Sequence, residues 1–369
     1  MNQELMSNLT GIMVGVALAY TLLLSIGLTG YIAYKPRRSS VKACNYEIVI
    51  VSKADEKVQR SLIESVKYHV SRFSHITLVV DEGAPLISTL RYLRGVRLIV
   101  VPSGYRRDLV GKGRALNYFV EHYVSPDKWY VFIDDDNLIL DDSFLYEIPY
   151  YEAKGFVAGN GILLPRPGKS MVSYVMDWIR YIDDLTLYRF FTGLLGKPLI
   201  GLHGELLIVK GSVLKEIGFN NRSITEDFRF AVELVRRKYK TWQSNTRVSI
   251  KSPNSVKDLM IQRGRWFKGL ITDIKYSPAP MKLIVGFRSF AWVLNLAVSV
   301  LFFPILVYLG LVWYILPGSI YYLASYTYGV IRSREPYLIL LVPLFGFIEA
   351  SSRIYGLMRV NDFVVIDKN

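Results

Sequence analysis

The sequence predicts an α/β domain, with a mostly parallel β-sheet covered by helices on both faces, set between apolar segments that can cross a membrane. Short runs rich in Val and Ile alternate with segments of helical spacing through the middle of the chain. A long uncharged stretch lies near the start, and a long apolar block follows residue 288. These observations divide the chain into residues 1–34, 35–280 and 281–369.

The first apolar segment, residues 9–34, contains no charged side chain. It is long enough for a membrane-spanning helix, which needs ~20 residues, and too long for the core of a signal peptide. Lys35, Arg37 and Arg38 follow directly. Because basic residues flank membrane helices on the cytoplasmic side, we expect the middle domain to lie in the cytoplasm.

The second apolar block, residues 289–331, is long enough for two spans, with a turn at Gly310 or at Pro317 and Gly318. A shorter apolar segment, residues 337–348, follows it. We therefore predict an integral protein of the cell membrane with about four transmembrane helices, one before the middle domain and three after it. Buried core helices of a soluble protein are the alternative.

The middle domain contains four strand-like runs separated by segments of helical spacing. In chain order, these strands and helices are expected at residues 47–51, 56–70, 76–80, 96–101, 113–124 and 129–133. Such alternation favours parallel strands, and ligands of parallel sheets bind at the carboxyl ends of the strands. Functional side chains are therefore expected just after each strand.

The composition limits the class of protein. With 45 Lys and Arg against 31 Asp and Glu, the formal net charge is +14, which admits nucleic acid, anionic lipid or a phosphorylated substrate as partner. The single cysteine, Cys44, excludes an intrachain disulfide and any metal site built from paired cysteines.

Three consecutive aspartates end the strand-like run in "WYVFIDDDN", residues 129–137. On an extended chain Asp134 and Asp136 point to one side and Asp135 to the other. Carboxylate oxygens select Mg²⁺ or Mn²⁺, which usually bind one or two carboxylates together with substrate phosphates. The pattern favours a divalent cation that also binds a diphosphate, and a solvated turn is the alternative.

Four other stretches carry residue types suited to the same chemistry. "VVDEG" places acids at a second strand end, and "GKGRALN" joins a glycine-rich turn and a lysine to a helix start, a common phosphate site. "SITED" is either a catalytic segment or a helix cap, and "QRGRW" is either a site motif or a basic interfacial helix. These stretches begin at residues 79, 111, 223 and 262.

In this order, "VVDEG", "FIDDDN", "TED" and "QRGRW" resemble the motifs of the membrane-bound family 2 glycosyltransferases. The resemblance covers residues 46 to about 270 and extends to the flanking apolar helices. This family has the GT-A fold, a Rossmann-like sheet with helices on both faces. It includes cellulose, chitin and hyaluronan synthases, ceramide glucosyltransferase and β-1,4-mannosyltransferases that act on glycolipids. The resemblance implies an enzyme, a hexosyltransferase that uses a nucleotide-sugar.

The resemblance also implies a role for each matching residue. Asp227 is the expected catalytic base, with Glu226 beside it, and Asp134 and Asp136 are the expected ligands of Mn²⁺ or Mg²⁺. The expected contacts of the nucleotide-sugar are Ser52, Lys53, Asp81, Glu82, Lys112, Asp134, Asp135 and Arg265. The motif that closes over the diphosphate and the acceptor consists of Gln262, Arg265 and Trp266, with His203 either on the acceptor side or structural. Lys53 departs from the family pattern, since an aromatic residue that stacks on the base is common there.

The implied reaction is a single displacement that inverts the anomeric carbon. A cation, Lys112 and Arg265 would balance the charge of the leaving diphosphate, and Asp227 would take the proton of the acceptor hydroxyl. GDP-mannose as donor and a membrane lipid or glycolipid as acceptor follow from the resemblance alone.

Three alternatives stay open. The first is a glycolipid glucosyltransferase that uses UDP-glucose, and the second is a processive β-polysaccharide synthase, for which about four spans are few. The third is a basic membrane protein that binds anionic lipid or nucleic acid. Because the third leaves the acidic motifs without a role, no nucleic acid is expected as partner.

Overall fold

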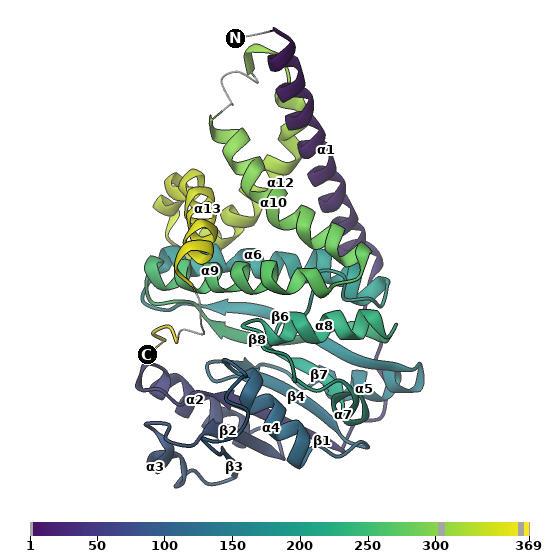
Figure 1. The fold of residues 1–369 in the computed structure, drawn as a ribbon, viewed down its shortest axis with the longest axis vertical. Helices are drawn as coiled ribbons and strands as arrows, with labels where there is room; N and C mark the ends of the chain where they lie inside the picture. The colour runs from purple at the N-terminus through teal and green to yellow at the C-terminus, as the bar shows by residue number, and fades with distance from the viewer. Residues whose placement is uncertain (1–2, 302–306, 361–364, 369) are drawn as a thin grey trace.

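The structure is a computed structural model and describes residues 3–301, 307–360 and 365–368. An α/β domain forms the broad part of the molecule, and a narrower group of helices extends away from it (Figure 1). Helices α1 (Gln3–Ala33), α10 (Ala279–Leu301) and α12 (Val312–Ser333) lie side by side in this group. Helix α9 (Val256–Asp273) lies between the sheet and this group.

An eight-stranded sheet, in the order β3-β2-β1-β4-β7-β6-β8-β5, forms the centre of the domain. The strands are β1 (Tyr46–Ser52), β2 (Ile76–Asp81), β3 (Val96–Val101), β4 (Trp129–Asp134), β5 (Leu138–Ile139), β6 (Phe156–Arg166), β7 (Leu207–Lys210) and β8 (Lys240–Lys251). The four strands expected from the sequence are β1 to β4, which extend one residue or less beyond the predicted ends.

The sheet is less parallel than the sequence predicts. Strands β3, β2, β1 and β4 pair in parallel, as do β6 and β8, but β7 is antiparallel to both of its neighbours and β5 is antiparallel to β8. The chain between β6 and β7 returns to the edge where β4 ends, so β7 starts there and runs backwards. Phe132 of β4 therefore pairs with Leu207 of β7, which places the residues just before β7 beside the aspartates that follow Phe132.

Helices cover both faces of the sheet, so the central strands are buried on both sides. Every residue of β1 is buried, and a strand of this kind appears in a sequence as a continuous apolar run. Phe119 of α4 and Phe230 of α8 contribute to the core on one face, and Leu62 of α2 and Phe144 of α5 contribute to the core on the other. The helices around the sheet are α2 (Gln59–Val70), α3 (Ile87–Leu90), α4 (Gly113–Tyr123), α5 (Ser143–Ala153), α7 (Gly211–Ile217) and α8 (Glu226–Arg236).

Further helices connect the sheet to the apolar group. They are α6 (Met171–Asp183), the π-helix η2 (Asp184–Leu194), α9 and α13 (Val342–Arg359), with short 3-10 segments at Glu56–Val58, Ile274–Tyr276 and Pro336–Leu341. The π-helix is unusual, because π-helices are rare and occur mostly as single turns near functional sites.

Two helices among the described residues are long and apolar enough to cross a membrane, Thr10–Ala33 and Pro336–Arg359. The prediction of four spans is therefore not supported. The block at 289–331 lies in α10, in α12 and in the chain between them, and residues 302–306 of this chain lie outside the described residues. Gly310, with φ of 68°, forms the turn of this block, because the alternative turn at Pro317 lies inside α12.

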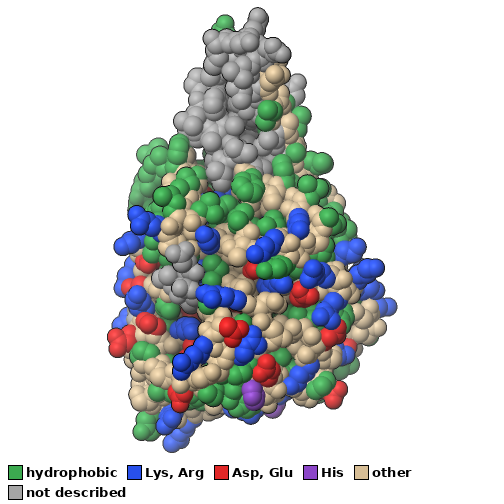
Figure 2. Space-filling view, in the orientation of Figure 1, with side chains coloured by type: hydrophobic (Ala, Val, Ile, Leu, Met, Phe, Trp, Pro, Cys, Tyr) green, Lys and Arg blue, Asp and Glu red, His purple; other side chains and the backbone are tan. Residues whose placement is uncertain are grey.

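The surface agrees with a domain that lies against a membrane. Figure 2 shows Lys and Arg interspersed with Asp and Glu over the α/β domain, and hydrophobic side chains gathered where the apolar helices join it. Leu22, Tyr31, Ile32 and Leu283 are among the exposed apolar residues of α1 and α10. Mixed charge keeps the domain soluble, whereas exposed apolar side chains on helices of this length favour contact with lipid.

Helix α1 is attached to the domain through close contact with the π-helix. A Cβ atom at Gly30 would lie 2.5 Å from the backbone nitrogen of Phe190 and 2.5 Å from the backbone oxygen of Thr186. Only glycine permits this approach of the two backbones. The position of the first apolar helix is thereby tied to the segment that begins at Asp184, which also lines the cavity described below.

The natural cysteine can report on which side of the membrane the domain lies. Cys44 is the single cysteine of the sequence and is exposed. Since Lys35, Arg37 and Arg38 predict a cytoplasmic domain, a membrane-impermeant maleimide should label Cys44 only after the cells are permeabilised. The variant Cys44→Ser gives the background, and labelling of Cys44 in intact cells would place the domain outside.

Candidate active site

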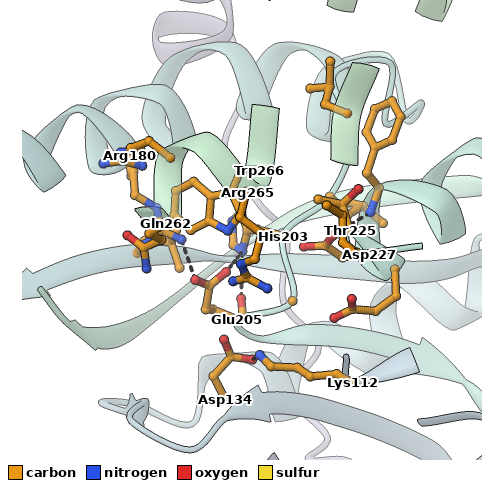
Figure 3. A pocket seen from close by; sticks show the side chains of 18 of the residues that line it. Lys112, Asp134, Arg180, His203, Glu205, Thr225, Asp227, Gln262, Arg265 and Trp266 are labelled. Carbon is orange, nitrogen blue, oxygen red and sulfur yellow. Dashed lines mark hydrogen bonds and ion pairs between the residues drawn. The ribbon is translucent and has the colours of Figure 1, made fainter. Parts of the chain in front are cut away.

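A cavity of about 300 Å³ lies between the carboxyl end of β4 and helix α9. Figure 3 shows Asp134 and Lys112 on the side of the sheet, and Gln262, Arg265 and Trp266 on the side of α9. The carboxyl edge of the parallel strands is where the sequence predicted the ligand. Segments far apart in the chain therefore meet in one cavity.

Each of the three consecutive aspartates has a different partner. Asp134 pairs with the ammonium of Lys112, Asp135 accepts a hydrogen bond of 2.6 Å from the hydroxyl of Ser52, and Asp136 lies 2.5 Å from the ammonium of Lys368. The strand ends at Asp134, so the alternation expected of a strand does not extend to Asp136. Both predicted metal ligands line the cavity, and each is paired with a cation of its own.

Lys112 holds several of these carboxylates together. Burial alone would lower the pKa of Lys112, but the negative charges of Asp134, Glu226 and Asp135 outweigh burial and raise it. Burial and the charge of Asp136 raise the pKa of Asp135 to about 6. The lysine is therefore charged at neutral pH and lies among carboxylates, where a phosphate oxygen could also reach it.

The first turn of α8 contributes Glu226 and Asp227. Thr225 is the N-cap residue of this helix, although its side chain makes no capping hydrogen bond, and both acids follow it in the first turn. The Asp227 carboxylate accepts a hydrogen bond of 2.7 Å from the backbone of Phe228. Burial and the charge of Glu205 raise the pKa of Asp227 to about 6. Burial and Asp227 raise the pKa of Glu226 to about 7. Asp227 is therefore mostly ionised at neutral pH, yet a stronger base than a free aspartate, whose pKa is ~3.9.

The turn before β7 brings His203 and Glu205 into the cavity. His203 Nδ1 lies 2.8 Å from the carbonyl of Glu205, and Nε2 lies 3.2 Å from a carboxylate oxygen of Asp184. Since both neighbours are acceptors, both ring nitrogens donate, and the imidazole is protonated. Burial would lower its pKa, but Asp184 outweighs burial and raises it. His203 therefore fixes this turn, which is the structural role given as one of its two alternatives. It also lines the cavity.

Glu205 and Arg180 are among the cavity residues that were not singled out from the sequence. The Arg180 guanidinium donates to the Glu205 carboxylate over 2.5 Å. Burial would raise the pKa of Glu205, but Arg180 and the His203 imidazolium outweigh it and lower that pKa. A signal was present, because Glu205 lies two residues after His203 and Arg180 belongs to an aromatic, amphipathic helix.

The motif on α9 forms the opposite wall. Gln262, Arg265 and Trp266 all line the cavity. The guanidinium groups of Arg180 and Arg263 lie 4.7 and 4.8 Å from the ring centre of Trp266, which fixes the indole between two cations. Among the described residues, the buried Gln262 Oε1 has no hydrogen-bond partner, and a buried polar atom in that state indicates a ligand or water.

The predicted contacts of the nucleotide base lie beside the cavity, and the structure separates them. Asp81 pairs with Lys53 at 2.6 Å and with Arg114 at 2.7 Å, and Lys53 lines the cavity. Lys53 and Arg114 also border an adjoining hollow of about 500 Å³. Glu82 instead accepts a hydrogen bond from the backbone of Ser103 at the exposed surface. The structure therefore does not bring Glu82 into the cavity.

Residues 365–368 enter the cavity from one side, which nothing in the sequence predicted. Val365, Ile366 and Lys368 are among its lining residues. The backbone nitrogen of Lys368 donates to the carbonyl of Lys57 over 3.1 Å, and the Lys251 ammonium donates to the carbonyl of Lys368. These contacts hold the Lys368 ammonium against Asp136.

The chemistry of these side chains fits a divalent cation. Asp134 and Asp136 offer hard oxygen ligands, and both already lie against an ammonium, which shows that positive charge is favourable there. Among the described residues, no group of three or more His, Cys, Asp or Glu converges to form a complete metal site. Such a set suits Mg²⁺ or Mn²⁺ bound jointly by protein carboxylates and substrate phosphates.

A sequence model described as glycosyl transferase family group 2 matches residues 129–348. The chain belongs to this family. The family resemblance noted from the motifs, and the expectation of a hexosyltransferase, are therefore confirmed.

Curated relatives agree with this result. The chain is 28% identical over 231 residues to β-1,4-mannosyltransferase egh of Drosophila melanogaster, a match that covers 59% of this chain and 50% of that protein. It is 25% identical over 209 residues to β-1,4-mannosyltransferase bre-3 of Caenorhabditis elegans, covering 53% and 46%. This chain thus spans about half the length of the curated relatives it matches.

Among solved structures, the mannosyltransferase PcManGT from Pyrobaculum calidifontis, in complex with GDP-Man and Mn²⁺, has a similar fold. The TM-score is 0.54 at 14% sequence identity, and the match covers 95% of this chain and 100% of that chain. The shared fold is a mixed α/β, GT-A-like fold.

A substitution at Asp136 tests whether this carboxylate holds a metal. Asp136→Ala removes one of two hard ligands, so Mn²⁺ should no longer strengthen the binding of GDP, whereas in the natural protein it should. Calorimetric titration of GDP with Mn²⁺ and with a chelator measures the difference. The matched control is Asp142→Ala, because Asp142 is a solvent-accessible aspartate paired with Lys42 outside the cavity. Metal-enhanced binding that survives in Asp136→Ala would remove Asp136 from the metal site.

Proposed function

We propose that this protein transfers mannose from GDP-mannose to a sugar of a membrane glycolipid, with inversion of the anomeric carbon. One observation carries the proposal. A Cβ atom at Gly204 would lie 3.7 Å from Asp227 Oδ2 and 3.8 Å from Asp134 Oδ1, so both carboxylates border the same bare backbone. A sugar over Gly204 would have its leaving phosphate on the side of Asp134 and the incoming hydroxyl on the side of Asp227.

Charges on the donor side suit a leaving diphosphate. The ammonium of Lys112 lies against Asp134, and Arg265 lines the same cavity from α9. A divalent cation, when bound to Asp134 and Asp136, supplies further positive charge for the phosphate oxygens. Fixed cations of this kind lower the energy of a transition state in which negative charge develops on the leaving group.

Asp227 is the base on the acceptor side. Its raised pKa of about 6 leaves it mostly ionised at neutral pH and brings its basicity closer to the operating pH, which favours proton transfer. It removes the proton of the acceptor hydroxyl while that oxygen forms the new bond to the anomeric carbon. One displacement on the face opposite the leaving group gives a β-linked product from an α-linked donor.

The choice of donor and acceptor rests on the comparisons and on the apolar helices. Two relatives are named β-1,4-mannosyltransferases, a linkage that requires a sugar hydroxyl as acceptor, and PcManGT was solved with GDP-Man and Mn²⁺. Two candidate membrane helices lie in the same chain, which supports an acceptor in the bilayer. UDP-glucose remains the alternative donor, because Lys53 replaces the aromatic residue expected beside the base.

Product analysis tests this proposal. The protein in lipid nanodiscs is incubated with Mn²⁺, a neutral glycolipid and either GDP-mannose or UDP-glucose. The mass of the lipid product is then measured by mass spectrometry. We expect one added hexose, from GDP-mannose only, that β-mannosidase removes. A product from UDP-glucose would show that the assignment of GDP-mannose as donor is wrong. A series of products with increasing numbers of hexoses would indicate a processive synthase.

The variant Asp227→Asn separates proton transfer from structure. An asparagine oxygen can still accept the hydrogen bond from the Phe228 backbone, but the amide cannot take a proton. Transfer should therefore slow by ~10²-fold or more, while GDP–Mn²⁺ affinity and the melting temperature stay close to those of the natural protein.

The pH profile provides the second measurement for the same residue. A protonated Asp227 cannot act as base, so kcat/KM of the natural enzyme should fall as pH drops through about 6. This acidic limb should be lost in Asp227→Asn. A variant that transfers mannose at nearly the natural rate would show that the base is a different residue, with Glu226 as the next to test.

A further inference from the structure

A second cavity, of about 230 Å³, adjoins the catalytic one on the side of the apolar helices. Its walls come from α1, α6, the π-helix, α9, α10, α12 and α13. Arg180, Arg263 and Trp266 line both cavities, so the indole and its two flanking guanidinium groups form the boundary between them. We call this second cavity the inner chamber. Anything bound in it lies next to the site of transfer.

One wall of the inner chamber is apolar. Leu23 and Leu24 of α1, Leu187 of the π-helix and Val285 of α10 contribute side chains to it. Leu23 and Leu24 belong to the segment that is long and apolar enough to cross a membrane. An apolar wall on such a helix suits the methylene groups of a lipid better than a water-soluble ligand.

Charged side chains also line the inner chamber, and most of them are paired with one another. Arg288 pairs with Asp183, and the Arg263 guanidinium lies 2.7 Å from Asp177 and 3.5 Å from Glu349. Arg180 is paired with Glu205 at 2.5 Å. Arg353 also lines the chamber, and its guanidinium donates to the carbonyl of Ser289 over 3.0 Å. These four arginines lie among four carboxylates, those of Asp177, Asp183, Glu205 and Glu349, so the groups offer hydrogen-bond donors and acceptors without a strong excess of positive charge.

These features favour a neutral sugar over a phosphate as the polar group in the inner chamber. A sugar has hydroxyls that both donate and accept, and its apolar ring face packs on an aromatic ring such as that of Phe267, which also lines the chamber. A phosphate would instead require arginines that are available for bidentate contacts.

We infer that the inner chamber binds the lipid-linked end of a neutral glycolipid acceptor, which enters from the bilayer beside α1. The inference rests on the proposed transfer to a membrane acceptor and adds the place, route and headgroup class of that acceptor. The sugar lies against the paired charges near Trp266, and the first methylenes of the lipid lie against Leu23 and Leu187.

Two neighbouring leucines of α1 provide a matched test. The Leu23 side chain is 6% exposed and lines the chamber, whereas Leu22 is 63% exposed and does not line it. In Leu23→Trp the larger ring fills the chamber, so kcat/KM for a long-chain glycolipid should fall about tenfold or more, while Leu22→Trp should leave it unchanged. Transfer to a short, water-soluble glycoside and GDP–Mn²⁺ binding should persist in both variants.

A second test uses the natural protein, so its result does not depend on whether Leu23→Trp folds correctly. A neutral glycolipid with a diazirine next to its headgroup should crosslink, on illumination, to peptides that contain Leu23 or Leu187. Addition of unlabelled glycolipid should suppress the crosslink. Equal transfer by Leu23→Trp and Leu22→Trp, crosslinks confined to other segments, or preference for a lipid phosphate would each overturn the inference. If the natural protein transfers no sugar to any acceptor, the proposed function itself is wrong.

Discussion

The buried ammonium of Lys112 is the interaction on which the catalytic cavity depends. Asp134, Asp135 and Glu226 all act on this one charge. Without it, burial and the charges of neighbouring acids would further favour the protonated forms of Asp135 and Glu226. The ammonium of Lys368 forms an ion pair of 2.5 Å with Asp136. Each of the three consecutive aspartates thus has its own partner, which is Lys112, Ser52 or Lys368. A site that holds carboxylates in this way already contains positive charge where a metal and a diphosphate would be bound.

The reversal of the chain at β7 completes the site. Because β7 is antiparallel to β4, the turn that precedes it meets the end of β4, and Gly204 fits between the carboxylates of Asp134 and Asp227. The His203 imidazolium and Asp184 fix that turn, and Asp184 is the first residue of the π-helix that packs on α1. The geometry of the reaction site and the position of the first apolar helix therefore depend on the same segment.

Part of this site could be predicted from the sequence because short polar motifs directly follow apolar strands or begin helices. Asp134, Lys112, Asp227 and Arg265 were found in this way, and the family resemblance supplied their roles. Glu205 could not be found by the same logic, because its position depends on a non-local antiparallel pairing. The sequence does not distinguish Lys368 from a solvated surface lysine, because its contact with Asp136 joins residues that are far apart in the chain.

The same distinction applies to the fold, where elements defined by local sequence were predicted and those that depend on distant pairing were not. Strands β1 to β4 are apolar runs and were predicted to within a residue. Strands β5 to β8 were not predicted, and the antiparallel pairings of β7 and β5 change the sheet from mostly parallel to mixed. Four membrane spans were predicted from the length of the apolar runs alone, and the structure supports two candidate spans among the described residues.

Diffraction from crystals grown with GDP-mannose and Mn²⁺, recorded to use the anomalous signal of manganese, tests the central claim most directly. We predict an anomalous peak beside the carboxylates of Asp134 and Asp136, with the diphosphate between that peak and the side chains of Lys112 and Arg265. The Lys368 ammonium should no longer contact Asp136. A nucleotide bound outside this cavity, or a nucleotide bound within it while Lys368 still occupies Asp136 and no manganese is present, would contradict the account.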